Sequence, residues 1–439
     1  MAHTASGLAR RLALWSVQAA LVGIVACGGG DRGGDSPRST TSNMQAEALR
    51  QAGSACKAAP GFTAQAPFIV NSLSADSQQQ VRFVGPLLDG GFAVAWLSRT
   101  PADTLTSWRL QWQQFDAAGR AIARASDLPY AEDVAPQDVA VMVQPSGRII
   151  VAYAVSRVID PDNPLVVMNS VLARRFQDGT ALAGQITIAT QTVNVRSFPG
   201  IFHFPVLAGF DEGSLLGGWH LVGRVKPELW VQNLSADGTP ASDLVKIDSL
   251  GAVNGVRVVG EQLVTLPGGG WIGVTPWRTP DPNLQENYTQ LTQVGVRHPL
   301  RTPDVFSVPH ALPAGSVLLQ NSRGLMVARG PSEGEPGSLQ QFNNGGKEAG
   351  QPVSLALTPI DAASLSTGEA VLLANAGDTI TLQRIGSRGR LIGQPLATSA
   401  PLDALAGAVP GGDLLLFWAR NDEGGSHVVA QLFTPRCSD

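Results

Sequence analysis

Charged residues, aromatic residues and cysteines are all scarce in this chain. Only 15% of its 439 residues are charged, 6% are aromatic and three are cysteine. The formal net charge is −4, which argues against nucleic acid as a partner. Glycine (49 residues) and proline (30 residues) are frequent, and 44% of the chain is hydrophobic. A chain with an ample apolar core, little charge and many turn formers is typical of a large all-β domain and not of a helical or disordered one.

The sequence motifs of common enzymes and metal sites are also missing. There is no H-E-x-x-H helix and no phosphate-binding loop, and the histidines are scattered without metal-ligand spacing. The acidic phrases DPDNP (160–164) and TPDPN (279–283) make calcium conceivable, but they lack the spacing of an EF-hand. We therefore expect no cofactor, with calcium as the alternative.

The first 26 residues have the pattern of an export signal. A basic pair (10–11) precedes an apolar stretch (12–26) that is too short for a membrane span, and no second membrane segment follows. The stretch ends in IVAC (24–27), which resembles the bacterial lipobox, whose cysteine is lipidated and becomes the mature N-terminus. The resemblance implies a signal peptide over 1–26 and lipidation of Cys27. Because glycine and not aspartate follows Cys27, it also implies an outer-membrane anchor, with the domain facing the periplasm or the cell surface. The alternative is an ordinary secretory signal with a chance cysteine.

Two short segments precede the folded domain. Residues 27–42 are rich in glycine and serine and lack apolar periodicity, as expected for a flexible tether. Residues 43–57 have the pattern of a short helix capped by Ser42 or Asn43, and the lead-in to the fold extends to residue 59. The folded domain is expected over 60–439.

A tight glycine turn followed by an apolar strand recurs along this domain. Gly91 is followed by FAVAWLSR and Gly412 by DLLLFWAR. Similar apolar segments follow Gly147, Gly213, Gly269, Gly324 and Gly368. Each copy has an apolar strand before its glycine, a third strand after a gap, and in most copies a polar turn that leads to a fourth strand. Seven four-stranded antiparallel units predict an all-β fold, a seven-bladed β-propeller. Because the fifth unit is weak, six and eight blades stay open.

The recurring aromatic residue of the second strand is interpreted as core. A large ring at this position fills the wedge between neighbouring blades. The residues concerned are Trp96, Tyr153, Trp219, Trp271 or Trp277, and Trp418.

The two ends of the domain are predicted to meet. The seventh unit ends after its third strand, which would leave an open sheet edge. The segment APFIVNS (66–72) is unassigned and similar to the fourth strands, so we expect it to close the ring as the last strand of that blade. Strand exchange would also bring Cys56 near Cys437, and we expect these two cysteines to form a disulfide in an oxidising compartment.

Long loops and a set of arginines select one face of the fold as the candidate site. The second-to-third and fourth-to-first connections are long and share one face, which we call the long-loop face. Six second strands end there in an arginine: Arg99, Arg157, Arg224, Arg278, Arg329 and Arg420. They are either a broken ring that binds an anionic ligand or acidic partner surface, or local partners of the acidic residues in their own loops.

The overall resemblance is to bacterial secreted β-propeller lipoproteins, in architecture and signal only. It implies a lipid-anchored binding or scaffold protein of the cell envelope that holds an envelope protein or an anionic glycan on its long-loop face. The alternative is a hydrolase or lyase that acts on envelope or extracellular polysaccharide. The turn SADGT (235–239) is only an incomplete echo of the sialidase Asp-box, so we expect binding in preference to catalysis.

Changing Arg99, Arg157, Arg278 and Arg420 together to glutamine tests the arginine ring. A ligand that binds only the folded protein raises the melting temperature by mass action. We expect anionic sugars to raise the melting temperature of the wild-type protein and not that of the quadruple variant. An equal shift in both proteins would mean that these arginines pair locally.

Overall fold

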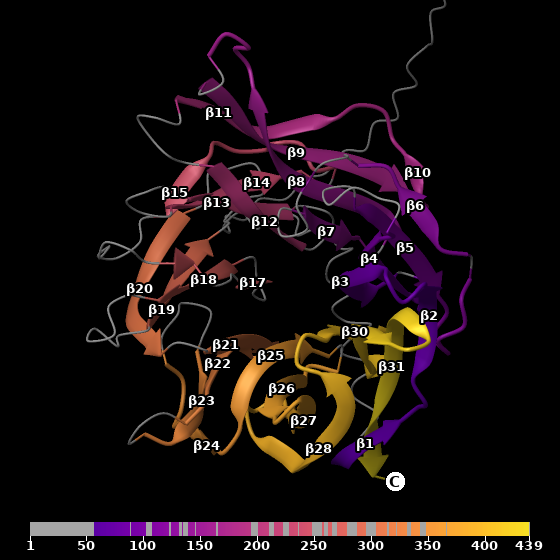
Figure 1. The fold of residues 1–439 in the computed structure, drawn as a ribbon. Coiled ribbons are helices and arrows are strands. Elements are labelled where there is room, and N and C mark those ends of the chain that lie inside the picture. Colours follow the sequence, from indigo (N-terminus) through magenta and orange to yellow (C-terminus); the bar gives the residue numbers. More distant parts are fainter. Residues whose placement is uncertain are drawn as a thin grey trace, which may run out of the picture. The chain divides into compact units, whose positions relative to one another are not determined.

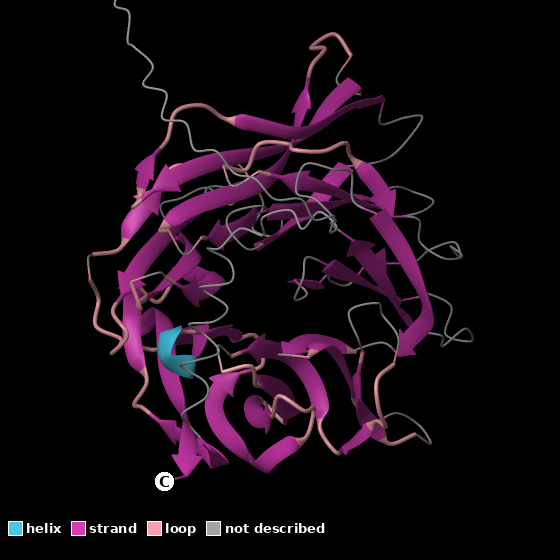
Figure 2. Ribbon diagram, turned by 180° about the vertical axis from the view of Figure 1, so that it is seen from behind, coloured by secondary structure: helices cyan, strands magenta, loops and turns pink. Residues whose placement is uncertain are grey.

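The structure is a computed structural model, and its strands form an all-β fold of antiparallel sheets. It describes residues 57–87, 89–101, 108–122, 124–130, 134, 139–144, 146–163, 166–194, 201–209, 215–222, 228–235, 237–247, 257–258, 262–265, 270–278, 288–295, 304–313, 316–321, 323–331, 335–342, 348–365 and 367–438. The described helical segment is the short 3-10 turn η3 (Pro410–Gly412), drawn in Figure 2. Within these ranges, no helix has the length and apolar character needed to cross a membrane.

The described strands group into seven sheets. Figure 1, coloured by sequence position, shows that most sheets are built from strands that are close together in the chain. The first sheet contains β3 (Gln78–Pro86), β4 (Phe92–Arg99), β5 (Arg109–Phe115) and β6 (Ser126–Leu128). The second contains β7 (Val139–Val143), β8 (Arg148–Val158), β9 (Val166–Gln177), β10 (Thr180–Ala181) and β11 (Ile186–Asn194). The third contains β12 (Ile201–Gly209), β13 (Leu215–Val222), β14 (Glu228–Leu234) and β15 (Val245–Ile247).

The remaining four sheets repeat this arrangement. The fourth contains β16 (Arg257–Val258), β17 (Gln262–Thr265), β18 (Gly270–Arg278), β19 (Tyr288–Gly295) and β20 (Asp304–Pro313). The fifth contains β21 (Val317–Asn321), β22 (Gly324–Arg329), β23 (Gly337–Gln341) and β24 (Val353–Leu355). The sixth contains β25 (Thr358–Ser364), β26 (Ala370–Ala376), β27 (Thr379–Ile385) and β28 (Leu391–Pro401). The seventh contains β29 (Leu405–Ala408), β30 (Leu414–Asp422) and β31 (Gly425–Ser438), with β1 (Lys57–Ala64) and β2 (Phe68–Leu73) from the N-terminal side.

The core lies between sheets, around the second strands. Trp96, Tyr153 and Trp418 are 0%, 2% and 3% exposed, which confirms the core interpretation for these three aromatic residues. Trp96 packs edge-on against Phe417 of the seventh sheet, with ring centres 6.4 Å apart. A strand that packs against a sheet on each face needs apolar residues at successive positions, which is why the second strands lack the usual alternation.

The turns between third and fourth strands bring successive sheets together. Gly179 and Gly238 have φ values of +80° and +79°, as the Asp-Gly sequences predict. A Cβ atom on Gly179 would lie 2.9 Å from the Trp112 side chain of the preceding sheet, and one on Gly238 would lie 3.3 Å from Ile150. Glycine therefore suits these turns for two reasons: it adopts the positive φ, and its lack of a side chain lets neighbouring sheets pack closely.

The first strands of the sheets contact one another in a regular order. β3 contacts β7, β7 contacts β12, β12 contacts β17, and β17 contacts β21. The order continues through β25 and β29, and β29 contacts β3. Each sheet therefore has the preceding and the following sheet as neighbours, along the edge formed by its first strand.

The N-terminal strands complete the seventh sheet. Phe68 pairs with Ala430 and Ser72 with His427, so β2 takes the place expected for residues 66–72. The pairing continues beyond the expected segment, because β1 pairs with the rest of β31 from Ala64 to Lys57. Lys57 is therefore extended and not helical, because its backbone completes the edge of β31. The other residues of the expected helix, Cys56 included, lie outside the described residues.

A buried arginine joins these closing strands to the sixth sheet. Arg384 is 2% exposed, and its Nη2 lies 2.8 Å from Glu369 Oε2. Its Nη1 donates to the carbonyl oxygens of Gly61 on β1 and Arg436 on β31, at 3.0 and 3.1 Å. The guanidinium also lies 5.7 Å from the ring centre of Phe62. One cation thus holds a carboxylate and two backbone carbonyls across a sheet boundary.

Replacing Arg384 with methionine should destabilise the protein strongly. The change leaves Glu369 buried without its cation and two carbonyl groups without their donor, for which we expect a loss of about 3 to 5 kcal/mol in the free energy of unfolding. Urea denaturation measures the loss. Arg388→Met, at an exposed position of the same sheet, is the control and should change stability by no more than about 0.5 kcal/mol. Equal midpoints for the two variants would contradict the role of Arg384.

Candidate functional site

Three of the six predicted arginines have partners within their own sheets. The contacts are Arg99 Nη2 to Gln78 Oε1 (2.8 Å), Arg329 Nε to Ser338 Oγ (2.8 Å) and Arg420 Nε to Asp422 Oδ2 (2.9 Å). Arg329 Nη2 also lies 4.0 Å from Glu335. Arg329 and Arg420 thus lie beside acidic residues close to them in sequence, whereas the partner of Arg99 is a glutamine of the neighbouring strand.

The other three arginines leave the predicted ring untested. Arg157 is exposed on β8. Arg278 ends β18, where only the backbone is described, and Arg224 lies outside the described residues. An anion-binding ring of arginines therefore stays a prediction.

A cavity of about 410 Å³ lies on the long-loop face, between the first and second sheets. Its walls are Trp108 and Arg109 at the start of β5, residues 127–130 along and after β6, and Arg174 of β9. Trp108 follows the second-to-third connection and Tyr130 begins the fourth-to-first connection. The cavity thus occupies the face that loop lengths had selected for recognition.

Tyr130 lines this cavity and packs against Tyr153 of β8 behind it. The rings of Tyr130 and Tyr153 meet edge to face, with centres 5.7 Å apart and planes at 69°. The Tyr130 hydroxyl donates to the Trp108 carbonyl oxygen at 3.4 Å. Burial raises the pKa of Tyr130 to about 12, against the opposing charge of Arg82. Burial also raises the pKa of Tyr153, against a hydrogen bond from Arg174 and the charges of Arg174 and Arg157. Both tyrosines are therefore protonated at neutral pH.

The cavity has more positive than negative side chains. Arg109 and Arg174 line it, while Asp127 is the carboxylate among the lining residues and accepts a hydrogen bond from Gln111 Nε2 at 2.8 Å. Arg174 Nη1 reaches the Pro129 carbonyl oxygen at 3.4 Å, and its buried Nε has no hydrogen-bond partner in the structure. A guanidinium beside aromatic rings is suited to hold a planar anion such as a carboxylate.

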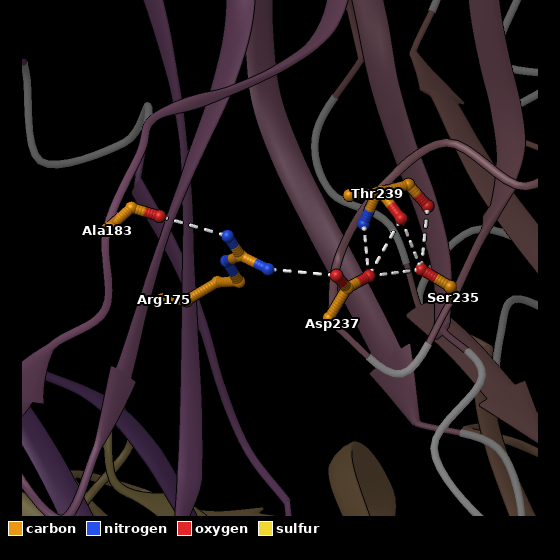
Figure 3. Close-up of polar contacts among 5 residues, drawn as sticks. All are labelled: Arg175, Ala183, Ser235, Asp237 and Thr239. Carbon is orange, nitrogen blue, oxygen red and sulfur yellow. Dashed lines mark hydrogen bonds and ion pairs between the residues drawn. The ribbon is translucent and has the colours of Figure 1, made fainter. Parts of the chain in front are cut away.

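The turn that echoes the Asp-box has a structural role in this protein. Asp237 accepts hydrogen bonds from Ser235 and Thr239 of its own turn, and Arg175 Nη1 of the preceding sheet lies 2.8 Å from its Oδ2 (Figure 3). Arg175 Nη2 donates to the Ala183 carbonyl oxygen at 3.0 Å. The hydrogen bond from Ser235, with those from Thr239 and the charge of Arg175, lowers the pKa of Asp237 to about 2. The ionised turn thereby ties the third sheet to the second.

Nothing in the described ranges gathers three or more histidine, cysteine or acidic side chains in the manner of a metal site. In the DPDNP loop, Asp160 Oδ1 accepts from the backbone N–H groups of Asp162 and Asn163, at 3.0 and 3.3 Å. The TPDPN loop lies outside the described residues. Calcium binding is therefore still a matter for experiment.

Comparisons with known proteins extend the fold assignment. No family model and no curated protein matches the chain. A crystal structure of a protein of unknown function from Dyadobacter fermentans is similar at 9% identity with a TM-score of 0.50, covering 86% of this chain and all of the other. The GH93 α-L-arabinofuranosidase of Fusarium graminearum is similar at 10% identity and a TM-score of 0.46, covering 84% of this chain and 98% of the enzyme. The polysaccharide lyase Uly1 is similar at 9% identity and 0.49, covering 81% and 90%. At these identities the likeness concerns the fold alone, which is all-β.

The cavity residues were not predicted from the sequence. Trp108 and Tyr130 lie in or beside long connections, and Arg174 is an interior residue of a third strand. The sequence does show an aromatic residue just before the third strand (Trp108) and another just after the fourth strand (Tyr130). It does not show that Arg174 approaches them from another sheet.

Acid titration tests the role assigned to Asp237. A carboxyl group whose pKa falls from 3.8 to about 2 on folding stabilises the native state above pH 3.8, and this stabilisation is lost as the pH falls towards 2. Because the side chain is 39% exposed, we expect Asp237→Asn to lower the free energy of unfolding by only about 1 kcal/mol at neutral pH. The gap should close between pH 4 and pH 2 in urea denaturation. Asp116→Asn is the control, because Asp116 pairs with Arg120 of its own turn and should have a smaller effect. A gap that stays constant with pH would contradict the assignment.

Proposed function

We propose that the protein acts on an acidic polysaccharide and binds a carboxylated sugar in the cavity between the first and second sheets. The observation that carries the proposal is the combination of Arg109 and Arg174 with the aromatic wall formed by Trp108 and Tyr130. A uronate offers both a planar carboxylate for a guanidinium and an apolar sugar face for an aromatic ring.

Elimination is the reaction that this set of side chains supports best. Hydrolysis of a glycosidic bond commonly uses two carboxyl groups, whereas Asp127 is the carboxylate among the lining residues. In an elimination, Arg174 neutralises the uronate carboxylate, Asp127 takes the proton from the adjacent carbon, and the protonated Tyr130 hydroxyl donates a proton to the leaving glycosidic oxygen. A C–H and a C–O bond break and a C=C bond forms, so no cofactor is required. A binding or scaffold role without turnover is the second candidate, favoured by the exposed rim of the cavity.

We also propose the finer features of the fold and its location. The cyclic order of first-strand contacts supports a seven-bladed propeller closed by the N-terminal strands. The pairing of Lys57 with Ser438 and of Ala58 with Cys437 supports a disulfide between Cys56 and Cys437. Lipidation of Cys27 and anchoring in the outer membrane rest on the lipobox resemblance, with an envelope protein as the alternative partner.

Calorimetric titration with uronate oligosaccharides tests the proposed function. Charge-assisted hydrogen bonds contribute about 1.5 to 3 kcal/mol, so Arg174→Gln should weaken binding by roughly 10- to 100-fold. Neutral oligosaccharides should not bind. Arg323→Gln, at an exposed turn of the fifth sheet, is the control and should bind as the wild type does.

A second readout separates turnover from binding. Elimination produces an unsaturated uronate that absorbs ultraviolet light, and Tyr130→Phe should reduce its rate while largely preserving affinity. Binding without this product supports the scaffold role. Absence of binding to every uronate polymer would contradict the proposed function.

A further inference from the structure

A chain of hydrogen bonds joins a serine, a histidine and an aspartate on the seventh sheet. Ser72 Oγ lies 2.9 Å from His427 Nδ1, and His427 Nε2 lies 3.2 Å from Asp422 Oδ1. Ser72 is exposed, whereas the histidine side chain is only 11% exposed. The pattern is that of a serine activated by an imidazole that a carboxylate orients.

The strand pairing at the chain ends assembles these three residues. Ser72 of β2 pairs directly with His427 of β31, more than 350 residues later in the sequence. Asp422 ends β30 and pairs with Gly425 across a tight turn, in which its Oδ1 also accepts from the Gly424 N–H at 2.9 Å. Gly425 has a φ of +143°, and a Cβ there would lie 2.3 Å from the Leu73 carbonyl oxygen. The turn and the edge strand therefore fit together closely around the imidazole.

Electrostatics at Asp422 select one tautomer of the histidine. Although desolvation acts in the opposite direction, hydrogen bonds from Gly424 and His427 and the charge of Arg420 lower the pKa of Asp422. An ionised carboxylate only accepts hydrogen bonds, so Nε2 of His427 carries the hydrogen. Nδ1 then has a free lone pair directed at the Ser72 hydroxyl.

A partly buried polar network holds the residues that precede Ser72 and His427. Gln79 Nε2 donates to the carbonyl oxygen of Ser426, the residue before His427, at 2.7 Å. Asn71, the residue before Ser72, donates to Gln79 Oε1 at 2.7 Å and to Gln111 Oε1 at 3.5 Å. Gln111 in turn donates to Asp127 of the cavity. The network fixes the backbone on both sides of the serine–histidine contact, and it runs from there to the cavity wall.

We propose that Ser72 is an activated nucleophile and that the protein hydrolyses carboxylic esters, with His427 as general base and Asp422 as the residue that positions it. Because Ser72 lies on an exposed edge strand, the substrate is an acyl ester displayed on a larger carrier, such as an O-acyl group on a polysaccharide. The activity goes beyond the proposed elimination and uses none of the cavity residues.

The reaction balances with water as the only co-substrate. Ser72 Oγ attacks the ester carbonyl carbon while its proton moves to His427 Nδ1. The C–O bond to the alcohol breaks, and the same proton leaves with the alcohol. Water then attacks the acyl-serine and gives one proton to Nδ1, which returns it to Ser72 Oγ as the carboxylic acid departs.

A fluorophosphonate probe, which reacts covalently with activated serines, tests the proposal on the full mature chain. We expect stoichiometric labelling, with the added mass located on the peptide that contains Ser72. Ser72→Ala should abolish labelling and the hydrolysis of p-nitrophenyl acetate. Asp422→Asn should slow both by at least about 10-fold, since an uncharged amide can donate as well as accept and no longer fixes the tautomer of the imidazole.

Two exposed neighbours provide matched controls. Ser74→Ala removes a hydroxyl that bonds to Ser77 and not to a histidine, and Asp76→Asn removes a nearby carboxylate. Both should label and hydrolyse as the wild type does, and all four variants should keep the wild-type melting temperature within a few degrees. No labelling of the folded wild type, or labelling that Asp422→Asn leaves unchanged, would overturn the proposal. Because neither readout involves a uronate, failure here is distinguishable from failure of the cavity.

Discussion

The pairing of β1 and β2 with β31 is the constraint on which the rest of the structure depends. It joins the two ends of the domain in one sheet, and Arg384 fixes that sheet to its neighbour through Glu369 and two backbone carbonyls. The Arg384 guanidinium is 2% exposed, so its contacts replace hydration that the cation has lost on folding. Without the closing strands, β31 would present an unpaired edge and Arg384 would be left with buried donors unfilled.

A similar arginine contact, with a more exposed partner, joins the second and third sheets. Arg175 and Arg384 each directly precede a buried residue near the end of a third strand, and both reach into the following sheet. Arg175 reaches a carboxylate of the following sheet, Asp237, which is 39% exposed, whereas Arg384 reaches two backbone carbonyls of the following sheet and pairs with the less exposed Glu369 of its own. Turn glycines act alongside them, because their lack of a side chain lets one sheet approach the next. Contacts of this kind hold each sheet against the next, which the short strands of a single sheet could not do alone.

Much of the fold could be predicted from the sequence, because its causes are local. The strand order within a unit could be predicted from Asp-Gly turns, apolar second strands and a recurring aromatic residue. Trp96, Tyr153 and Trp418 are buried as expected. The place of residues 66–72 in the seventh sheet could be predicted by counting strands, and β2 pairs with β31 there. The cavity could not be predicted, because Arg174 reaches it from a different sheet than Trp108. The contact of Ser72 with His427 was hidden for the same reason, since it exists only when the chain ends are paired.

Native-state hydrogen exchange of the hydrogen-bonded amides in β2 is the most direct test of this account. If the closing strands hold the domain together, these amides exchange through the same opening as those of β30, with the same free energy and the same dependence on denaturant. Weakening the contact at Arg384 should then accelerate exchange in both strands equally. The account would be contradicted if β2 exchanged far faster than β30 while the inner strands of the seventh sheet kept their protection.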